Sequence, residues 1–330
     1  MRAVEIADYS HVADARREGN AIGKSLGYSE EDCGRIAIIA TELATNLTKH
    51  AGGGEILVGS SLTSEGPCVE IIAIDKGPGM QLDACLADGF STAGTRGTGL
   101  GASKRQATTF DAWSVPSLGT AIHVRICPGR TPYKAKQTIP WGAVVRPLAS
   151  EQASGDAVAV RESRDRFVAL AADGLGHGTF AADAANLAVD TFRQAHSFEA
   201  EDLAASIHAA LRATRGAAIG IMTMDLPAHV STFCGIGNIA GSLNSLGQSK
   251  KLTTLNGTAG LVARRIQGFQ YPYARDTLLI MHSDGISNSW ALEKYPGLAQ
   301  AAPMLIASVL YRDFGKARDD ASILVARLNQ

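Results

Sequence analysis

Residues 127–140 form a stretch rich in proline, glycine and basic residues that separates two regions of regular apolar periodicity. Its three prolines exclude a continuous helix or a central strand, and such a composition is typical of a short, semi-extended linker. A chain of 330 residues is long enough for two domains that each bury a core. We therefore predict one domain at residues 1–134 and a second at residues 135–330.

Composition excludes several classes of protein. The net charge is -1, and no run of Lys or Arg indicates a nucleic-acid partner. No segment reaches the ~20 apolar residues that span a bilayer, and the first residues lack the apolar core of a signal peptide. The five cysteines are scattered without C-x-x-C spacing, which favours free thiols in a reducing cytosol. We expect a cytoplasmic protein without a nucleic-acid or membrane partner; the sequence leaves its oligomeric state open.

The first region alternates helical and strand patterns. Residues 11–26 have helical periodicity, and a second helix begins after Ser29, whose hydroxyl can cap it with Asp32 three residues on. A glycine-rich stretch covers residues 77–101. Strands are predicted at residues 55–62, 69–75 and 120–126. These elements predict an α+β sandwich with helices on one face of a mixed sheet.

Short apolar runs dominate the second region. They predict strands at residues 143–148, 156–160, 167–172, 218–224, 230–234, 277–281 and 322–326. Helical patterns lie at residues 179–194, 200–214 and 303–311. This alternation, with acidic residues at strand ends, predicts two sheets packed face to face with helices outside.

Two elements of the first region suit a nucleotide and its metal ion. Glu42 and Asn46 lie four apart and share one face of the predicted helix. There a carboxylate can accept a proton, and an amide oxygen can hold Mg²⁺. Asp75 ends an apolar strand, and Gly77 and Gly79 after it let the backbone approach a flat ligand.

A third element, Gly97-Thr98-Gly99-Leu100-Gly101, precedes a helix and can expose N–H groups to phosphate. In this order, the three elements closely resemble the N, G1 and G2 boxes of the GHKL ATPase family. The motifs at residues 89–94, 97–102 and 119–120 narrow the resemblance to its RsbT-like switch-kinase subgroup. The resemblance implies a GHKL (Bergerat) α/β sandwich that binds ATP and Mg²⁺.

The same resemblance assigns roles to residues. Glu42 would be the general base toward a protein serine or threonine, and Asn46 would hold Mg²⁺. The implied nucleotide-binding set is Asn46, Asp75, Gly77, Gly79, Gly97, Gly99, Leu100, Gly101 and Thr120. Since no histidine-phosphorylation helix is present, an autokinase of the two-component type is not expected.

Acidic pairs recur at the ends of predicted strands in the second region. They are Asp173-Gly174, Asp284-Gly285 and Asp319-Asp320. Carboxylates and backbone carbonyls are hard oxygen donors for Mg²⁺ or Mn²⁺. Because converging carboxylates repel one another unless cations lie between them, the pattern predicts a two-metal site that can activate water against a phosphate ester.

The run Asp173-Gly174-Leu175-Gly176-His177-Gly178 resembles PP2C-type phosphatases of the SpoIIE and RsbX kind, as does the motif at residues 235–239. The resemblance implies a PP2C-like α-β-β-α sandwich with two Mn²⁺ or Mg²⁺ ions. The implied metal site comprises Asp156, Asp173, Gly174, Asp284 and Asp319, with Asp320 as the alternative to Asp319.

Two assignments in the phosphatase-like region stay open. His177 is either a general acid for the leaving serine oxygen or a histidine at a helix start near anions. No arginine occupies an obvious phosphate-binding position, so Arg161 and Arg164 are the candidates.

The two resemblances together predict a bifunctional bacterial stress and sigma-factor regulator. Its first domain would phosphorylate, and its second dephosphorylate, Ser/Thr of STAS-type anti-anti-sigma or stressosome scaffold proteins. One alternative makes the first domain a nucleotide-gated, anti-sigma-like binding module, against which Glu42 argues because binding needs no base. A second makes one half catalytically dead. A third, a GHKL chaperone-like ATPase, lacks a large coupling domain.

Overall fold

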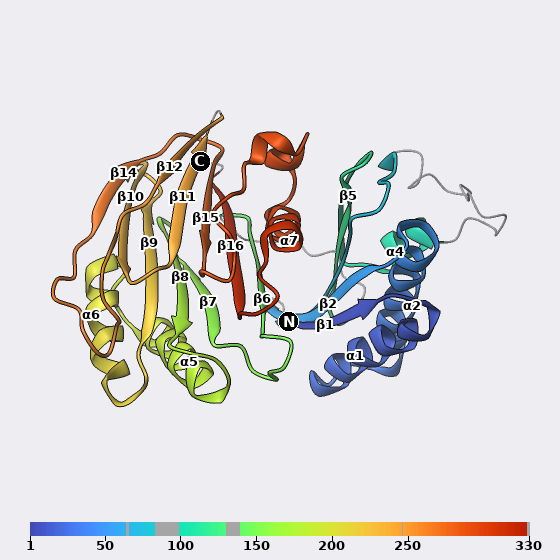
Figure 1. Cartoon of the computed structure of the whole chain (residues 1–330), viewed down its shortest axis with the longest axis horizontal. Coiled ribbons are helices and arrows are strands. Elements are labelled where there is room, and N and C mark those ends of the chain that lie inside the picture. Colours follow the sequence, from blue (N-terminus) through green and yellow to red (C-terminus); the bar gives the residue numbers. More distant parts are fainter. Residues whose placement is uncertain (64–65, 83–98, 130–138, 246, 329–330) are drawn as a thin grey trace. The chain divides into compact units, whose positions relative to one another are not determined.

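The computed structural model describes residues 1–330 except 64–65, 83–98, 130–138, 246 and 329–330. The chain divides into two compact units (Figure 1). Unit 1 comprises Met1–Lys136 and Leu292–Ala301, and unit 2 comprises Gln137–Ala291 and Ala302–Gln330. The predicted domain boundary between residues 134 and 135 lies outside the described residues.

Unit 1 contains a five-stranded sheet of order β1-β2-β3-β5-β4. The strands are β1 (Arg2–Ile6), β2 (Gly54–Thr63), β3 (Gly66–Asp75), β4 (Thr109–Val115) and β5 (Gly119–Ile126). Every neighbouring pair is antiparallel, so the predicted mixed sheet is wrong. The reason is that β5 lies between β3 and β4, so these two strands, which run in the same direction, are not neighbours.

The helices α1 (Val12–Ser25), α2 (Glu30–Asn46) and α4 (Gly99–Gln106) pack on one face of this sheet. Unit 1 also contains short 3₁₀ helices at Tyr9–His11, Leu292–Lys294 and Leu298–Gln300 and a π-helical turn at Leu47–Ala51. Ser29 caps α2 as predicted, because its side chain accepts a hydrogen bond from the backbone N of Asp32 at 3.1 Å. Ile36, Ile39 and Leu43 of α2 are buried against alternate residues of the strands, which explains the helical spacing of these positions.

The opposite side of β3 and β5 carries a buried charged cluster. Glu70 accepts hydrogen bonds from Ser61 and, at 2.6 Å, from Arg125 Nε. His123 Nε2 lies 2.5 Å from Glu70 Oε2. Burial alone would raise the pKa of Glu70, but His123 and Arg125 outweigh it and lower that pKa to about 2. Burial alone would lower the pKa of His123, but the charge of Glu70 outweighs it and raises that pKa to about 8.

The same two strands are joined covalently. Cys68 and Cys127 form a disulfide with a Cα–Cα distance of 4.4 Å. The expectation that all five cysteines are free thiols is therefore wrong. The pairing of Val69 with Ile126 places the two cysteines opposite each other, which a sequence separation of 59 does not reveal. Cys33 and Cys234 are free, and Cys85 lies outside the described residues.

Unit 2 is built from two sheets. The first has the order β13-β10-β9-β8-β7, with β14 also paired to β10, and the second has the order β12-β11-β15-β16-β6. The strands are β6 (Trp141–Arg146), β7 (Asp156–Glu162), β8 (Arg166–Gly174), β9 (Ala217–Asp225), β10 (Val230–Ile236), β11 (Ala240–Ser245), β12 (Gln248–Lys251), β13 (Thr254–Leu255), β14 (Phe269–Pro272), β15 (Thr277–His282) and β16 (Ala321–Leu328). The sequence predicted seven of these strands and missed the short ones from β11 to β14.

Helices cover the outer faces of the two sheets. α5 (Thr179–Gln194) and α6 (Ala200–Ala210), followed by a 3₁₀ turn at Leu211–Ala213, pack on the first sheet, and α7 (Pro303–Phe314) packs on β6 and β16. The predicted helix at residues 179–194 is thereby confirmed with its bounds. The layers are helix, sheet, sheet and helix, as the resemblance implied.

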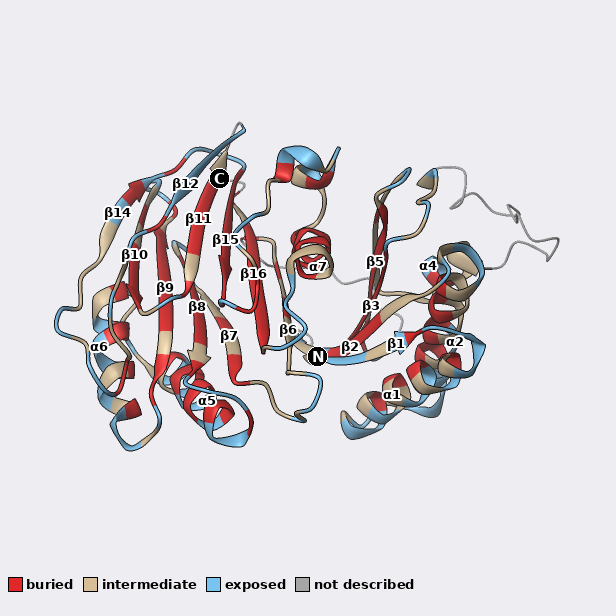
Figure 2. Cartoon of the chain, in the orientation of Figure 1, coloured by how far each residue is buried: buried red, intermediate tan, exposed pale blue. Residues whose placement is uncertain are grey.

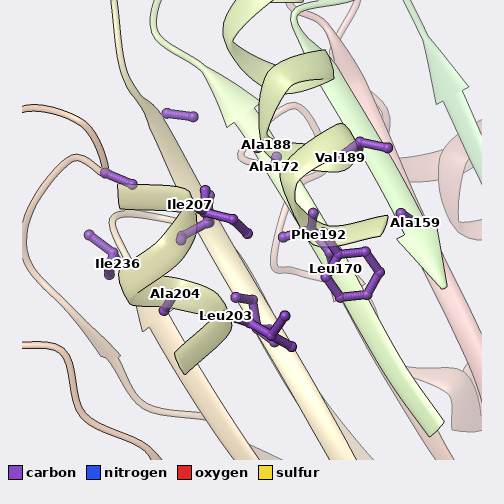
Figure 3. Packing of buried hydrophobic residues seen from close by; sticks show 14 of the residues in the cluster. Ala159, Leu170, Ala172, Ala188, Val189, Phe192, Leu203, Ala204, Ile207 and Ile236 are labelled. Atoms are coloured by element: carbon purple, nitrogen blue, oxygen red, sulfur yellow. The ribbon is translucent and has the colours of Figure 1, made fainter. Parts of the chain in front are cut away.

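Two apolar layers hold unit 2 together. One lies between the sheets, and both sheets are largely buried (Figure 2). The other lies between the first sheet and its helices, where Phe192 of α5 and Leu203 of α6 share a cluster with Leu170 of β8 (Figure 3). Because successive strand residues point to opposite layers, β8 reads as an unbroken apolar run that ends at Asp173.

A search for membrane-spanning segments among the described residues found no helix with the length and apolar character to cross a bilayer.

Candidate functional sites

Both sheets of unit 2 present acidic residues at one end. Asp156 begins β7 and Asp173 lies near the end of β8, and the antiparallel register pairs these two residues directly. In the second sheet, Asp284 follows β15, and Asp319 and Asp320 precede its neighbour β16. The topology therefore gathers acidic residues that lie more than 160 positions apart in the sequence.

Ser283 connects the two acidic ends. Its hydroxyl donates to Asp156 Oδ2 at 2.5 Å and accepts from the backbone N of Ser322 at 3.1 Å. Ser283 is fully buried, so this link is shielded from water. Sequence reasoning missed Ser283, although it directly precedes the Asp284-Gly285 pair.

The paired carboxylates are held in an environment that disfavours their charge. Burial, reinforced by the negative charges of Asp320 and Asp319, raises the pKa of Asp156 to about 7. Burial, followed by the charges of Asp156 and Asp284, raises the pKa of Asp173 to about 8. Both shifts have the sign expected when converging carboxylates are not neutralised by a cation.

Asp319 and Asp320 play different parts. Asp320 is buried and accepts hydrogen bonds from the backbone N of Leu148 at 2.7 Å and of Gly155 at 3.0 Å. These bonds fix the loop that leads into β7. Asp319 is partly exposed, and its carboxylate lies close enough to Asp284 for that charge to raise its pKa, after burial as the first cause.

Asn238 orients Asp284. Its Nδ2 donates to Asp284 Oδ2 at 2.8 Å from the turn that joins β10 to β11. The sequence singled out the motif at residues 235–239 by resemblance, but no pattern in it indicated this contact. The sequence thus identified the motif that contains Asn238 but did not predict its hydrogen bond to Asp284.

The glycines of the Asp-Gly pairs are required by close packing. A Cβ on Gly174 would lie 2.1 Å from the Ala181 carbonyl oxygen, and one on Gly285 would lie 1.9 Å from the Asp320 carbonyl oxygen. No side chain fits at either position. Glycine therefore allows the strand ends that carry Asp173 and Asp284 to approach α5 and β16.

The donor set fits hard divalent cations. It consists of carboxylate and carbonyl oxygens, which Mg²⁺ and Mn²⁺ prefer, and its charge is unfavourable without them. Within the described residues, no three His, Cys, Asp or Glu side chains form a ready-made metal cage.

His177 lies on the exposed rim of this site. Its Nδ1 is 2.9 Å from Glu151 Oε1, and its side chain is 64% exposed. The contact gives the imidazole a fixed orientation just before α5 begins. The geometry is compatible with both readings of His177, a proton donor and a histidine at a helix start.

The two predicted phosphate-binding arginines do not serve that role. Arg161 donates to the Phe192 and Ser197 carbonyls at 2.8 and 3.2 Å and stacks over Phe192, so it holds α5 onto β7. Arg164 lies in the β7–β8 turn, at the end of the hairpin opposite to Asp156 and Asp173. Both predictions are wrong, since strand spacing alone does not tell which end or face a residue occupies.

In unit 1, Asp75 is fixed at the end of β3. Its Oδ1 accepts hydrogen bonds from the backbone N of Gly77 at 2.8 Å and of Thr120 at 3.2 Å. Gly79 has a φ of 72°, and a Cβ there would lie 2.2 Å from the Val115 carbonyl oxygen. The structure thus brings together Asp75, Gly77, Gly79 and Thr120, as the sequence predicted for one pocket.

Ser114 completes this arrangement. Its hydroxyl lies 2.9 Å from Thr120 Oγ1 and accepts from the backbone N of Met80 at 2.8 Å. It comes from β4, a strand that the sequence analysis did not predict, and so it was missed.

Glu42 faces the start of α4. Its Oε2 lies 3.5 Å from the position of a Cβ on Gly99, so the carboxylate is adjacent to the described part of the element predicted to bind phosphate. Asn46 ends α2 just before the π-helical turn, a feature frequent at functional sites. Leu100 and Gly101 lie in the first turn of α4, and Gly97 lies outside the described residues.

Comparison with known proteins identifies one relative clearly. A scan against protein-family models found no match. Over 112 residues, however, the chain is 37% identical to "Serine/threonine-protein kinase RsbT" of Bacillus subtilis (strain 168), covering 34% of this chain and 84% of that protein. The chain belongs to the RsbT family.

This RsbT-family chain also has a second relative. It is 23% identical over 134 residues to "Phosphoserine phosphatase RsbX" of the same strain, covering 40% of this chain and 67% of RsbX. A solved structure described as "The bacterial stressosome: a modular system that has been adapted to control secondary messenger signaling" matches with a TM-score of 0.54 and 24% identity. That match covers 58% of this chain and all of the other. The chain is thus a fusion of an RsbT-like region with an RsbX-like, PP2C-type region.

Proposed function

We propose that unit 2 is a metal-dependent phosphatase for phosphoserine or phosphothreonine in proteins. The observation that carries this proposal is the direct pairing of Asp156 with Asp173, both with raised pKa values, at the end where Asp284 and Asp319 also lie. The similarity to RsbX supports the same chemistry.

Asp173, the Gly174 carbonyl, Asp284 and Asp319 would hold two divalent ions, with Asp156 orienting water. Bound there, Mn²⁺ or Mg²⁺ supplies charge neutralisation and acidification of water. Asn238 would orient Asp284 through its hydrogen bond, and Ser283 links the acidic ends of the two sheets through its hydrogen bond to Asp156. His177 on the rim can donate a proton to the departing serine oxygen.

We propose further that unit 1 binds Mg-ATP in a GHKL-type fold and phosphorylates a STAS-domain partner. Asp75 would accept from the adenine amino group, Asn46 would hold Mg²⁺, and Glu42 would take the proton of the protein hydroxyl. The adjacency of Glu42 to Gly99 supports this role, because it puts the base next to the element that would hold the phosphates. The 37% identity to RsbT supports the activity.

The phosphatase proposal is tested by hydrolysis of p-nitrophenyl phosphate. We expect activity with Mn²⁺ and its loss in EDTA, with recovery on adding Mn²⁺ back. Hydrolysis that persists in EDTA would contradict a metal site built from these carboxylates.

The kinase proposal is tested with γ-labelled ATP and purified STAS-domain proteins. An Asp173→Asn background prevents unit 2 from removing the label. In it we expect transfer to a STAS domain, abolished by Glu42→Gln and retained by Glu30→Gln, an exposed glutamate at the start of the same helix. If nucleotide binds and no label is transferred, unit 1 is the nucleotide-gated binding module instead.

A further inference from the structure

An exposed apolar cluster surrounds Arg215 next to the acidic end of unit 2. Eight large hydrophobic residues are exposed in the described chain, and four of them, Leu175, Phe180, Leu261 and Val262, lie here. Each is more than half exposed. We call these four residues and Arg215 the Arg215 rim.

Backbone and side-chain contacts connect the segments that carry the rim. The backbone N of Leu175 donates to the Gly216 carbonyl at 3.0 Å, and a Cβ on Gly216 would lie 3.2 Å from Leu261 Cγ. Val262 is held in a tight turn by reciprocal backbone hydrogen bonds with Thr258 at 2.8 and 3.0 Å. Segments from three parts of the sequence therefore meet on one surface.

Arg215 is exposed and stacks on one member of this surface. Its Cζ lies 4.8 Å from the centre of the Phe180 ring, and its Nη1 lies 3.3 Å from the position of a Cβ on Gly176. Within the described part of the chain, no carboxylate forms an ion pair with it. A guanidinium stacked on an aromatic ring keeps its donors free for a phosphate.

The rim adjoins the paired carboxylates. In the β8–β9 register, Asp173 lies opposite Ala218 and Gly174 lies opposite Ala217. Arg215 precedes Ala217 by two residues, so it lies close to the Asp-Gly pair in the chain path. Arg212, Arg264 and Arg265 are also exposed on the segments that carry the rim. The surface thus offers positive charge and apolar area beside a group of acidic residues.

We propose that the Arg215 rim is the docking surface for a phosphorylated protein substrate. Arg215 binds the phosphoryl group as it enters the acidic site, and Phe180, Leu261 and Val262 pack on apolar side chains that flank the phosphoserine. A phosphate of about -1.5 to -2 charge complements the arginines, and the apolar rim gives selectivity for protein over small phosphate esters. The proposal rests on the phosphatase function proposed above.

The test compares three substrates with Mn²⁺. They are p-nitrophenyl phosphate and two phosphoserine peptides of equal charge, one flanked by Leu and Val and the other by Ser and Gly. We expect the wild type to prefer the apolar peptide about tenfold in kcat/KM, from the burial of one or two aliphatic side chains. The Leu261→Ser/Val262→Ser variant loses this preference and hydrolyses p-nitrophenyl phosphate at the wild-type rate.

Arginine variants test the phosphate contact. Arg215→Ala raises KM about 10- to 100-fold for all three substrates, as expected for a lost charge-assisted hydrogen bond, and Arg215→Lys recovers part of the loss. Arg275→Ala and Leu62→Ser are matched controls, because Arg275 lies at the opposite end of the sheets and Leu62 lies in unit 1. Neither control changes any of these values.

Equal activity on the two peptides, or an equal loss on p-nitrophenyl phosphate in the double variant, would overturn the docking surface. An Arg215→Ala protein that behaves like Arg275→Ala would overturn the phosphate contact. A wild type that hydrolyses none of the three substrates would refute the phosphatase proposal itself. Peptide affinity by fluorescence anisotropy would then still decide docking, because weaker binding of the apolar peptide to the double variant needs no turnover.

Discussion

Asp75 in unit 1 and Asp173 in unit 2 both terminate buried strands, yet their surroundings differ. Asp75 receives hydrogen bonds from two backbone N–H groups, so its acceptor is oriented and stabilised by the chain itself. Asp173 faces Asp156 across the β7–β8 pair, and burial and like charges raise its pKa to about 8. An aspartate at a strand end can thus have its negative charge stabilised by backbone N–H groups, or be left among other carboxylates where its charge is unfavourable.

The difference predicts that cations stabilise the two aspartates unequally. In unit 1, protein dipoles fix the carboxylate that would read the nucleobase. In unit 2, two sheets bring several carboxylates together, and bound cations or protonation relieve their repulsion.

Asp173→Asn should lower Mn²⁺-dependent hydrolysis of p-nitrophenyl phosphate by roughly 10³-fold or more, because it removes the proposed shared ligand of two ions. ATP affinity, measured by isothermal titration calorimetry, should stay within twofold of the wild type. Asp276→Asn, an exposed aspartate before β15, is the matched control. Retained hydrolysis in Asp173→Asn would show that the paired carboxylates are not the reaction centre.

Asp75→Ala should weaken ATP binding by roughly 10- to 100-fold, since it leaves the backbone N–H groups of Gly77 and Thr120 without their acceptor and removes the contact to the base. Phosphatase activity should not change. Calorimetry with ATP and with GTP is the measurement. An equal affinity for both nucleotides in the wild type would contradict an adenine-reading role for Asp75.

Asn238→Ala should lower Mn²⁺ affinity about tenfold, the usual scale for losing a residue that orients a metal ligand. Direct titration of Mn²⁺ by electron paramagnetic resonance measures this without turnover. Asn244→Ala is a suitable control, because Asn244 lies near the far end of β11. Unaltered affinity in Asn238→Ala would mean that its bond to Asp284 does not position a ligand.

The smallest effect concerns the Glu70–His123 pair. The folded-state pKa of His123 is raised to about 8 from 6.5, so its stabilisation is complete below pH 6.5 and is lost as the pH rises through 8. The pKa of Glu70 is lowered to about 2 from 4.5, so its contribution is present above pH 4.5 and is lost as the pH falls toward 2.

The free energy that this pair adds to folding should therefore be greatest between about pH 4.5 and 6.5. Urea unfolding of the wild type and of Glu70→Gln/His123→Gln across this range measures the difference. A difference that does not vary with pH would argue against a charged pair.

Local sequence patterns predicted the features of the fold that depend on residues close together in the sequence. The cap at Ser29, the helix at residues 179–194 and the aspartates at strand ends were all visible, because each follows from short-range periodicity. The edge strand β1 and the partly buried β4 lack a long apolar run and were missed, and Ser114 was missed with β4.

Long-range register was not predictable in the same way. The Cys68–Cys127 bond, the antiparallel order of the first sheet and the bond between Asn238 and Asp284 depend on which strands become neighbours. Arg161 illustrates the same point, since its spacing was compatible with a phosphate site while its position on β7 turns it toward α5. Arg215 belongs to no sequence motif, and its place beside Phe180 became apparent only from the folded structure, in which three segments of the chain meet.

The pairing of β6 with β16 has a consequence for synthesis of the protein. The first strand of unit 2 finds its partner only in the last strand of the chain, whereas the five strands of the unit 1 sheet are all present once Ile126 has been made. Translation of the roughly 200 residues in between, at about 5–20 residues per second, takes roughly 10–40 s. Each new molecule thus passes through an interval on the ribosome in which the strands of the proposed kinase are complete and the sheets of the proposed phosphatase are not.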